Sequence, residues 1–305
     1  MTIKSPVTGK ENTVFERKIP SSFIIQKYKE KLNIDVSRFF SGVDSVSIYK
    51  CLDTGYRFYY PFNVSGDDTF YQELQKFPWY YMDWKWEHGM AEKFIKKDDK
   101  VLEIGCARGS FLKKIKENGA FPEGLEMNSN AISECIKNGI PVQPETIEKF
   151  ATDKKDLYDV VCSFQVLEHV QDAKDFLESS LSILKPGGLM IVSVPNNDCL
   201  IYKFGDDVLN IPPHHMGMWD INSLIKLQDN FKMKIESIYL EPFQKYHLGF
   251  TDKIVEKKID NKLSQKLGPF DVLIKKIAKR FANLGVSAVS EYIVGLTIMI
   301  VFRKD

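Results

Sequence analysis

Apolar runs of strand length are separated by helical stretches and turns along most of the chain after residue 100. The first begins at Val101 and passes through a turn of small residues directly into a helix, which is typical of an α/β protein. The segments expected to contain the strands of one sheet are 101–104, 124–128, 158–170, 189–196, 231–240 and 291–302.

The turn after the first strand has the composition of a cofactor-binding loop. Gly105 and Gly109, with Ala107 between them, let the backbone approach a ligand, and the following helix presents its N-terminal N–H groups to the same place. Such turns also occur for packing alone. The cofactor contacts predicted here are Glu103, Gly105, Cys106, Ala107 and Gly109.

A carboxylate stands about twenty residues further on, at the end of the next expected strand. Glu126, followed by Met127, is predicted to bind the two ribose hydroxyls of a nucleoside cofactor. A nicotinamide-binding dehydrogenase would use the same arrangement with Gly-x-Gly-x-x-Gly, but Ser110 occupies its third glycine position. The spacing therefore disfavours a dehydrogenase.

The block from Val101 to Asn196 resembles a class I S-adenosylmethionine-dependent methyltransferase. It is similar to the branch of sugar and quinone-biosynthesis enzymes, which share the phrases Leu-Glu-His-Val (here 167–170) and Lys-Pro-Gly-Gly (here 185–188). Ala107 departs from the usual middle glycine. The resemblance implies S-adenosyl-L-methionine as cofactor and a Rossmann-like, seven-stranded, mostly parallel sheet whose last strand is antiparallel beside the fifth.

By strand order, the resemblance also places further residues at the cofactor. Thr146 and Ile147 are expected beside the adenine, and Gln165 at the end of the fourth strand. A helix from about 80 to 96 is expected over the cofactor mouth, which makes Tyr80 and Tyr81 candidates to touch the methionine end.

Two short motifs near the N-terminus lie where related sugar-modifying methyltransferases carry Cys-Pro-x-Cys-Gly and Cys-x-x-Cys-Gly. Here they are Ser-Pro-Val-Thr-Gly (5–9) and Cys-Leu-Asp-Thr-Gly (51–55), so three of four thiolates are missing. Because a structural zinc site needs four ligands, this predicts a zinc-ribbon-like lobe that no longer binds metal. Two unrelated turns are the alternative.

Thirteen aromatic residues, three of the four tryptophans among them, crowd residues 56–86. Their flat faces suit stacking on a sugar or an aromatic acceptor, or attachment of the lobe to the main domain.

The loop 210–220 contains Pro-Pro-His-His, in which His214 and His215 are the main candidates for a catalytic base. A neutral imidazole can take the proton of an alcohol that attacks the methyl group. His169 is a second candidate, although it could simply fasten its loop. Magnesium on Asp198, Asp206 and Asp207 is an alternative, but no metal is expected.

Composition limits the partners. Lys and Arg total 42 against 41 for Asp and Glu, so no global field recruits nucleic acid. The N-terminus lacks the apolar core of a signal peptide, and the longest apolar run, 293–302, is too short to span a bilayer, which predicts a cytoplasmic protein with reduced cysteines. A basic amphipathic helix over 270–281 could contact a membrane peripherally, form a homodimer interface, or pack on its own domain.

The expected domains are an N-terminal lobe over 1–75, a methyltransferase domain over 76–250, a basic helical insertion over 251–288 and the last strand within 289–305. The predicted function is O-methylation of a hydroxyl on a sugar or glycan precursor, by in-line transfer with a histidine base. The alternatives are methylation of a quinone or other small aromatic molecule, and a non-catalytic S-adenosylmethionine-binding partner protein.

Overall fold

The computed structural model describes residues 3–80, 82–199, 202, 207–244 and 294–305. Tyr81, the predicted insertion 251–288 and the predicted basic helix 270–281 lie outside these ranges. No helix among the described residues is both long and apolar enough to cross a bilayer.

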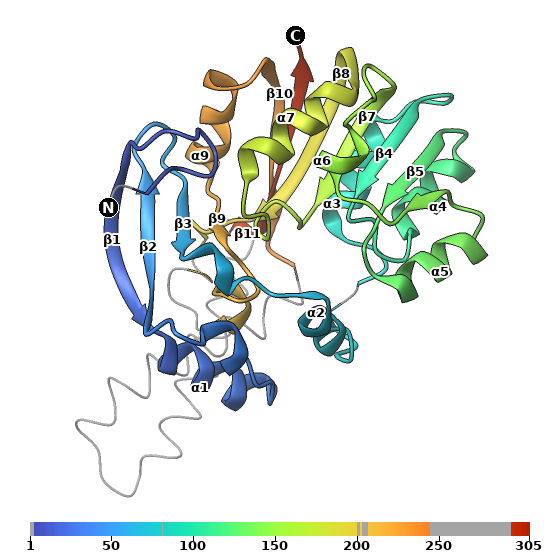
Figure 1. Cartoon of the computed structure of the whole chain (residues 1–305). Helices are drawn as coiled ribbons and strands as arrows, with labels where there is room; N and C mark the ends of the chain where they lie inside the picture. Colours follow the sequence, from blue (N-terminus) through green and yellow to red (C-terminus); the bar gives the residue numbers. More distant parts are fainter. Residues whose placement is uncertain (1–2, 81, 200–201, 203–206, 245–293) are drawn as a thin grey trace, which may run out of the picture.

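The centre of the protein is a seven-stranded sheet in the order β10-β11-β8-β7-β4-β5-β6 (Figure 1). Six strands run in the same direction, and β11 alone runs antiparallel, between β8 and β10. This is the predicted Rossmann-like α/β sheet, including the antiparallel last strand beside the fifth. Its strands are β4 (Lys100–Ile104), β5 (Phe121–Leu125), β6 (Val142–Gln143), β7 (Tyr158–Phe164), β8 (Leu184–Pro195), β10 (Met233–Pro242) and β11 (Val294–Lys304).

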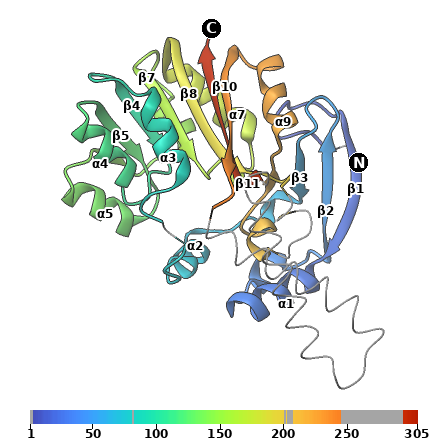
Figure 2. The ribbon, with the colours of Figure 1, turned by 180° about the vertical axis from the view of Figure 1, so that it is seen from behind.

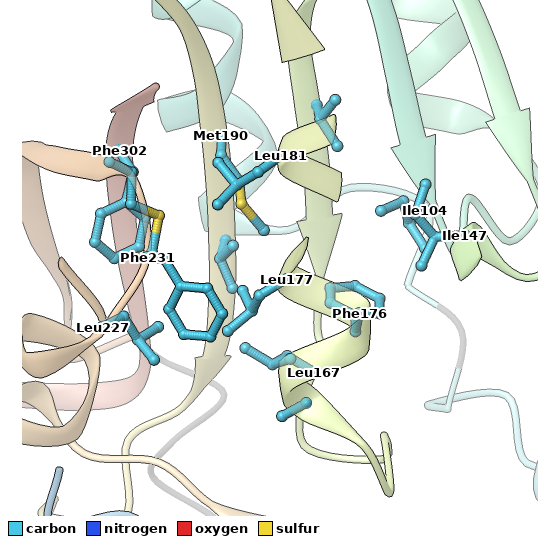
Figure 3. Close-up of a cluster of buried hydrophobic side chains, with 14 of the residues drawn as sticks. Ile104, Ile147, Leu167, Phe176, Leu177, Leu181, Met190, Leu227, Phe231 and Phe302 are labelled. Carbon is cyan, nitrogen blue, oxygen red and sulfur yellow. The ribbon is translucent and has the colours of Figure 1, made fainter. Parts of the chain in front are cut away.

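Both faces of this sheet are covered, as the strand sequences require. Along β8, Met190 and Val192 belong to one buried cluster while Ile191 between them belongs to another, because successive side chains point to opposite faces. Figure 3 shows the first cluster, in which Leu177 and Leu181 of α7 lie over Met190. The covering helices are α3 (Trp86–Ala91), α4 (Ser110–Glu117), α5 (Ser129–Lys137), α6 (Ile147–Phe150), α7 (Ala173–Ile183) and α9 (Ile221–Ile225).

A second sheet of four antiparallel strands, in the order β1-β2-β3-β9, forms the N-terminal lobe. Figures 1 and 2 show it beside α9 and β10, away from β5. Its strands and helix are β1 (Thr13–Pro20), α1 (Ser21–Leu32), β2 (Ser45–Cys51), β3 (Arg57–Tyr60) and β9 (Gly217–Met218). Because β9 comes from the middle of the chain, the lobe sheet is completed by the segment that follows the two histidines.

The connection between the lobe and β4 differs from the expected helix over 80–96. Helix α2 (Asp68–Leu74) comes first, capped by the Asp67 side chain, which accepts a hydrogen bond from the Phe70 amide at 3.0 Å. The next α-helix is α3, which begins only at Trp86 and is capped by Lys85. The aromatic side chains are thus distributed over strand, loop and helix, and six of the thirteen pack in the lobe core.

Candidate active site

The turn between β4 and α4 has a conformation that requires its glycines. Gly105 and Gly109 both have φ of +72°. A Cβ on Gly105 would lie 2.6 Å from Val166 Cγ2, and one on Gly109 would lie 2.9 Å from Cys135 Sγ. Ala107 also has a positive φ, of +46°. The backbone therefore curls tightly at the end of β4, as expected for a cofactor loop.

Glu126, at the end of β5, holds this turn through its carboxylate. Its Oε2 accepts a hydrogen bond from the Ala107 amide at 2.9 Å, and its Oε1 accepts from the amides of Met127 at 2.9 Å and Asn128 at 2.8 Å. A carboxylate oxygen can accept more than one hydrogen bond, so the same group can still receive ribose hydroxyls. The structure thus places Glu126 beside the turn, and its contact with ribose stays a prediction from the sequence.

A cavity of about 590 Å³ lies at the carboxyl ends of the parallel strands, a volume in the range of small-molecule sites. Its lining includes the turn after β4, residues of α2, and Leu209, His214 and His215 from the histidine loop, 209–216. Glu103 lies inside, and within the described residues its Oε2 has no hydrogen-bond partner. Burial raises the pKa of Glu103 well above its ordinary value. A buried acceptor without a partner favours a ligand that donates hydrogen bonds.

Most of the predicted cofactor residues line this cavity: Glu103, Gly105, Cys106, Ala107, Glu126, Met127 and Gln165. Gly109 instead begins α4, just behind the lining. Thr146 and Ile147 are not among the lining residues. Thr146 caps α6, and Ile147 is buried in the core beside Ile104 (Figure 3).

The three candidate histidines come together in the lining of the cavity, although His169 is 45 residues before His214 in the sequence. His169 follows β7, while His214 and His215 precede β9. Their ring centroids are separated by 4.6 Å (His169 to His214), 4.9 Å (His169 to His215) and 4.5 Å (His214 to His215). The amides of Met216 and Gly217 both donate to the Glu168 carbonyl at 2.9 Å, which joins the two loops.

Each histidine has a hydrogen-bond partner for its Nδ1 atom. His169 Nδ1 lies 2.6 Å from the His214 carbonyl oxygen, and His214 Nδ1 lies 2.9 Å from the Leu209 carbonyl oxygen. His215 Nδ1 lies 3.1 Å from Asn210 Oδ1. Since a carbonyl oxygen only accepts, each neutral ring donates from Nδ1 and keeps a lone pair on Nε2.

The side chain of Glu168 lies against two of these lone pairs. Its Oε1 is 3.8 Å from His169 Nε2 and 4.0 Å from His215 Nε2. Its Oε2 has no partner among the described residues. Burial raises the pKa of Glu168 to about 8, lowers that of His169 to about 4, and lowers the pKa values of His214 and His215 well below the ordinary value. The imidazoles are therefore neutral near pH 7.

Tyrosines hold the cluster from the side of the lobe and of α2. Tyr28 of α1 donates to the Ile211 carbonyl and Tyr59 of β3 to the Asn210 carbonyl, both at 3.0 Å. Tyr80 Oη lies 2.9 Å from His214 Nε2, and Tyr71 Oη lies 3.2 Å from His169 Nδ1. The sequence placed Tyr80 near the methionine end of the cofactor; the structure places its hydroxyl at His214.

One face of α2 supplies polar lining that the sequence analysis missed. Asp68, Tyr71, Gln72 and Gln75 line the cavity, and their spacing of three and four residues puts them on the same side of the helix. That spacing was visible in the sequence, but the crowd of aromatic residues around it suggested packing instead.

The two N-terminal motifs form matching turns that face each other. The Gly9 amide donates to the Ser5 carbonyl and the Gly55 amide to the Cys51 carbonyl, both at 2.8 Å, and both glycines have positive φ. Thr8 Oγ1 lies 4.0 Å from Cys51 Sγ. Burial raises the pKa of the Cys51 thiol, while hydrogen bonds to the side chains of Ser5 and Thr54 lower it, with a net lowering.

Residues 79–237 match the family model described as "Methyltransferase domain", which is just over half of the chain. The chain belongs to this family. The predicted class, an S-adenosylmethionine-dependent methyltransferase, is therefore confirmed at the level of the domain.

Curated relatives include a protein named "Ubiquinone biosynthesis O-methyltransferase" from Vibrio vulnificus (strain YJ016), 29% identical over 144 residues, which are 44% of this chain and 60% of that protein. A protein of the same name from Proteus mirabilis (strain HI4320) is 30% identical over 42% of this chain and 55% of its own length. The chain thus spans about 60% of the length of these relatives.

Among solved structures, a putative S-adenosylmethionine-dependent methyltransferase from Listeria monocytogenes matches 72% of this chain and 98% of its own, with a TM-score of 0.48 and 16% identity. A SAM-dependent methyltransferase from Archaeoglobus fulgidus matches 71% of this chain and 94% of its own, with a TM-score of 0.47 and 18% identity.

Proposed function

We propose that this protein is an O-methyltransferase that acts on a hydroxyl group of a sugar or glycan precursor. The observation that carries the proposal is a single cavity with the cofactor turn at one end and three neutral histidines with Glu168 at the other. A donor held at the turn and an acceptor hydroxyl held at the histidines would share one enclosed space, which is the arrangement that in-line transfer requires.

At the turn, the chain offers three kinds of contact to the donor. Glu126 would receive the ribose hydroxyls, the backbone from 105 to 109 would lie along the nucleoside, and Glu103 would accept hydrogen bonds at the methionine end. S-adenosylmethionine, when bound, supplies a methyl group on a positively charged sulfur and leaves as S-adenosylhomocysteine. The residues fit this group by the size of the cavity and by the acceptor left without a partner on Glu103.

At the other end, the cluster prepares the acceptor. An Nε2 lone pair of His169, His214 or His215 would take the hydroxyl proton as the acceptor oxygen attacks the methyl carbon. The donor, when bound, would supply that methyl group and keep the electron pair of the broken carbon–sulfur bond on its sulfur. The hydrogen bonds from Nδ1 to carbonyl oxygens keep each ring oriented for this step.

The polar face of α2 supports a polyhydroxylated acceptor. Asp68, Gln72 and Gln75 offer donors and acceptors to several hydroxyls, and the exposed ring of Trp79 at the rim offers a flat face for a sugar. The alternative acceptor is a quinone or another small aromatic molecule. The curated relatives carry that function in their names, and Trp79 and Met82 at the mouth would suit a flat ring as well.

The experiment is a methyl-transfer assay with the full chain, following S-adenosylhomocysteine release against a panel of nucleotide-sugars and a panel of catechols. We expect turnover with members of the sugar panel, and a large loss of kcat in H214Q/H215Q with donor affinity retained. Turnover with catechols alone would establish the aromatic alternative. Donor binding without turnover on either panel would indicate a non-catalytic binding protein.

We also infer that the N-terminal lobe is a zinc ribbon in which hydrogen bonds have replaced the metal. The support is the matched pair of turns, in which Ser5, Thr8, Cys51 and Thr54 occupy the two positions of each Cys-x-x-Cys pattern. In this protein the lobe would serve to hold the histidine loop, through Tyr28 and Tyr59.

A further inference from the structure

We propose that His169, His214 and His215 bind a divalent transition-metal ion, with Zn²⁺ as the most suitable, at the end of the cavity opposite the cofactor turn. One ring nitrogen from each histidine lies within 4.8 Å of the others, and no other such group of histidine, cysteine, aspartate or glutamate occurs among the described residues. The sequence predicted no metal because the three histidines belong to loops that only the fold brings together.

Two ring nitrogens and the Glu168 carboxyl group face one another without a direct hydrogen bond. Glu168 Oε1 lies 3.8 Å from His169 Nε2 and 4.0 Å from His215 Nε2, which is too far for such a bond. A cation bound between these atoms would be held by the two imidazole lone pairs and by the carboxyl oxygen. The Oε2 atom of Glu168 is also buried and has no partner among the described residues, which marks this carboxyl as a group that lacks a ligand.

Hydrogen bonds around the three imidazole rings also favour a metal site. Histidines that bind a metal through one nitrogen usually donate the other N–H to a carbonyl or carboxylate, which fixes the ring. All three do so here, to the carbonyls of His214 and Leu209 and to Asn210 Oδ1. Asn210 is itself held, since its Nδ2 donates to Asn197 Oδ1 at 2.8 Å. The rings are therefore oriented before any ligand arrives.

The type of ligand atom determines which ion fits the site. Imidazole nitrogens suit zinc and its neighbours, whereas Mg²⁺ and Ca²⁺ prefer oxygen ligands. Tetrahedral Zn–N bonds of about 2.0–2.1 Å place ligand atoms roughly 3.4 Å apart, so small side-chain rotations would close the present spacing. Tyr80 Oη, 2.9 Å from His214 Nε2, would move aside or become an outer partner.

This inference rests on the proposed function in one respect, since both place the acceptor hydroxyl at the cluster. The bound ion would act as a Lewis acid and stabilise the deprotonated form of the acceptor hydroxyl. In that case a free imidazole lone pair would not be needed as the base. Metal binding can nevertheless be measured without any acceptor.

The test uses the tag-free full chain, stripped with a chelator and titrated with Co²⁺, whose visible absorption reports coordination by nitrogen, and then with Zn²⁺ in competition. We expect one Co²⁺ per chain with the intense bands of a four-coordinate site, displaced by Zn²⁺. H169Q, H214Q and H215Q should each weaken binding at least about 100-fold, and N210L, which removes an outer partner, by about 10- to 100-fold.

Two matched variants control for other soft ligands. H88N removes a histidine from the same cavity and C51S removes a buried thiol, and neither should change the stoichiometry or the spectrum. No spectral change at a large excess of Co²⁺, or binding that survives all three glutamine variants, would overturn the metal site. Methyl transfer at full rate by the stripped chain would overturn the ion's role as Lewis acid while leaving the proposed function intact. Metal binding without transfer to any acceptor would confirm the metal site and overturn the proposed function.

Discussion

Single side chains shape the turn after β4, and Glu126 is the clearest case. Its carboxylate accepts three backbone amides around the cofactor turn, so it both shapes the turn and faces the cavity. Thr146, which the sequence also placed at the cofactor, instead caps a short helix.

These two placements predict different effects of substitution. E126A should raise the dissociation constant for S-adenosylmethionine at least about tenfold, because charge-assisted hydrogen bonds contribute about 1.5–3 kcal/mol each. T146A should leave it within about twofold, since helix capping affects stability first. Isothermal titration calorimetry measures both, and equal effects of the two variants would contradict the site as described.

The burial of His88 should make the free energy of unfolding depend on pH. It lines the cavity between Phe111 and Phe164, and its Nδ1 accepts from the Lys85 amide at 3.3 Å. Burial, with a smaller effect of Lys85, lowers the pKa of His88 to about 3 from 6.5. The folded state thus resists protonation, so the free energy of unfolding should be unaffected by His88 above its unfolded pKa and should decrease as the pH falls below it.

H88N keeps an acceptor near the position of Nδ1 but has no proton to bind. Compared with the wild type, it should lose less stability on acidification, by up to about 3 kcal/mol at about pH 4. Urea unfolding at a series of pH values measures the difference. Parallel pH profiles for the two proteins would show that His88 titrates normally in the folded state.

At the scale of elements, the lobe positions the histidine loop. Tyr28 on α1 and Tyr59 on β3 donate to consecutive carbonyls of the loop, and β9, directly after it, pairs with β3. The lobe therefore fixes the loop from two sides, and the loop in turn orients His214 and His215.

Loss of the Tyr28 or Tyr59 hydroxyl should disturb the histidine loop and leave donor binding unchanged. Y28F and Y59F should each cost about 1–3 kcal/mol of stability, because a buried carbonyl loses its partner, and should lower kcat. The dissociation constant of the donor should stay unchanged. Y60F, at the next position of β3, is the control for removal of a phenol hydroxyl, and a rise in donor dissociation constant in Y59F would contradict the separation of the two ends.

The facing turns of the lobe make a second prediction at this scale. The triple variant S5C/T8C/T54C, together with native Cys51, should bind one Zn²⁺ with four thiolates and gain thermal stability in its presence. Cobalt substitution with its sulfur charge-transfer bands would detect the site. The variant S5C/T8C/T54C/C51S, which lacks one of the four thiolates, should have a much lower affinity for Zn²⁺. Equal Zn²⁺ affinity of the two proteins would argue against a ribbon geometry.

At the scale of the whole molecule, the lobe and the large sheet are joined so that they should unfold together. Trp219 is fully buried, with its ring centroid 4.2 Å from that of Tyr56 in the lobe, while Asn197 after β8 donates to its carbonyl at 3.1 Å. The boundary at residue 75 stays a prediction from the sequence, although β9 shows that the lobe sheet draws on a later segment.

We expect one cooperative transition on heating, with coincident near- and far-ultraviolet circular dichroism. The donor at 100 times its dissociation constant should raise the unfolding free energy by about 2.7 kcal/mol for both signals. A donor-dependent shift confined to one of two separate transitions would show that the lobe folds independently of the site.

The sequence alone determined the large sheet, the cofactor turn and Glu126. These features depend on neighbours along the chain: alternating apolar residues choose the two faces of a strand, and a positive φ, as at Gly105, favours glycine. A carboxylate at the end of the adjacent strand follows from parallel pairing of β4 and β5. Thr146 and Ile147 do not line the cavity, and their place at the cofactor stays a prediction from the sequence.

Only the tertiary structure decided how the histidines are arranged. His169 is 45 residues from His214, and no local pattern shows that Met216 and Gly217 bond to the carbonyl of Glu168. Contacts of this kind depend on the packing of the lobe against the sheet. The sequence gives the histidines as candidates, but the fold brings their three rings together and places His169 and His215 beside the buried carboxyl group of Glu168.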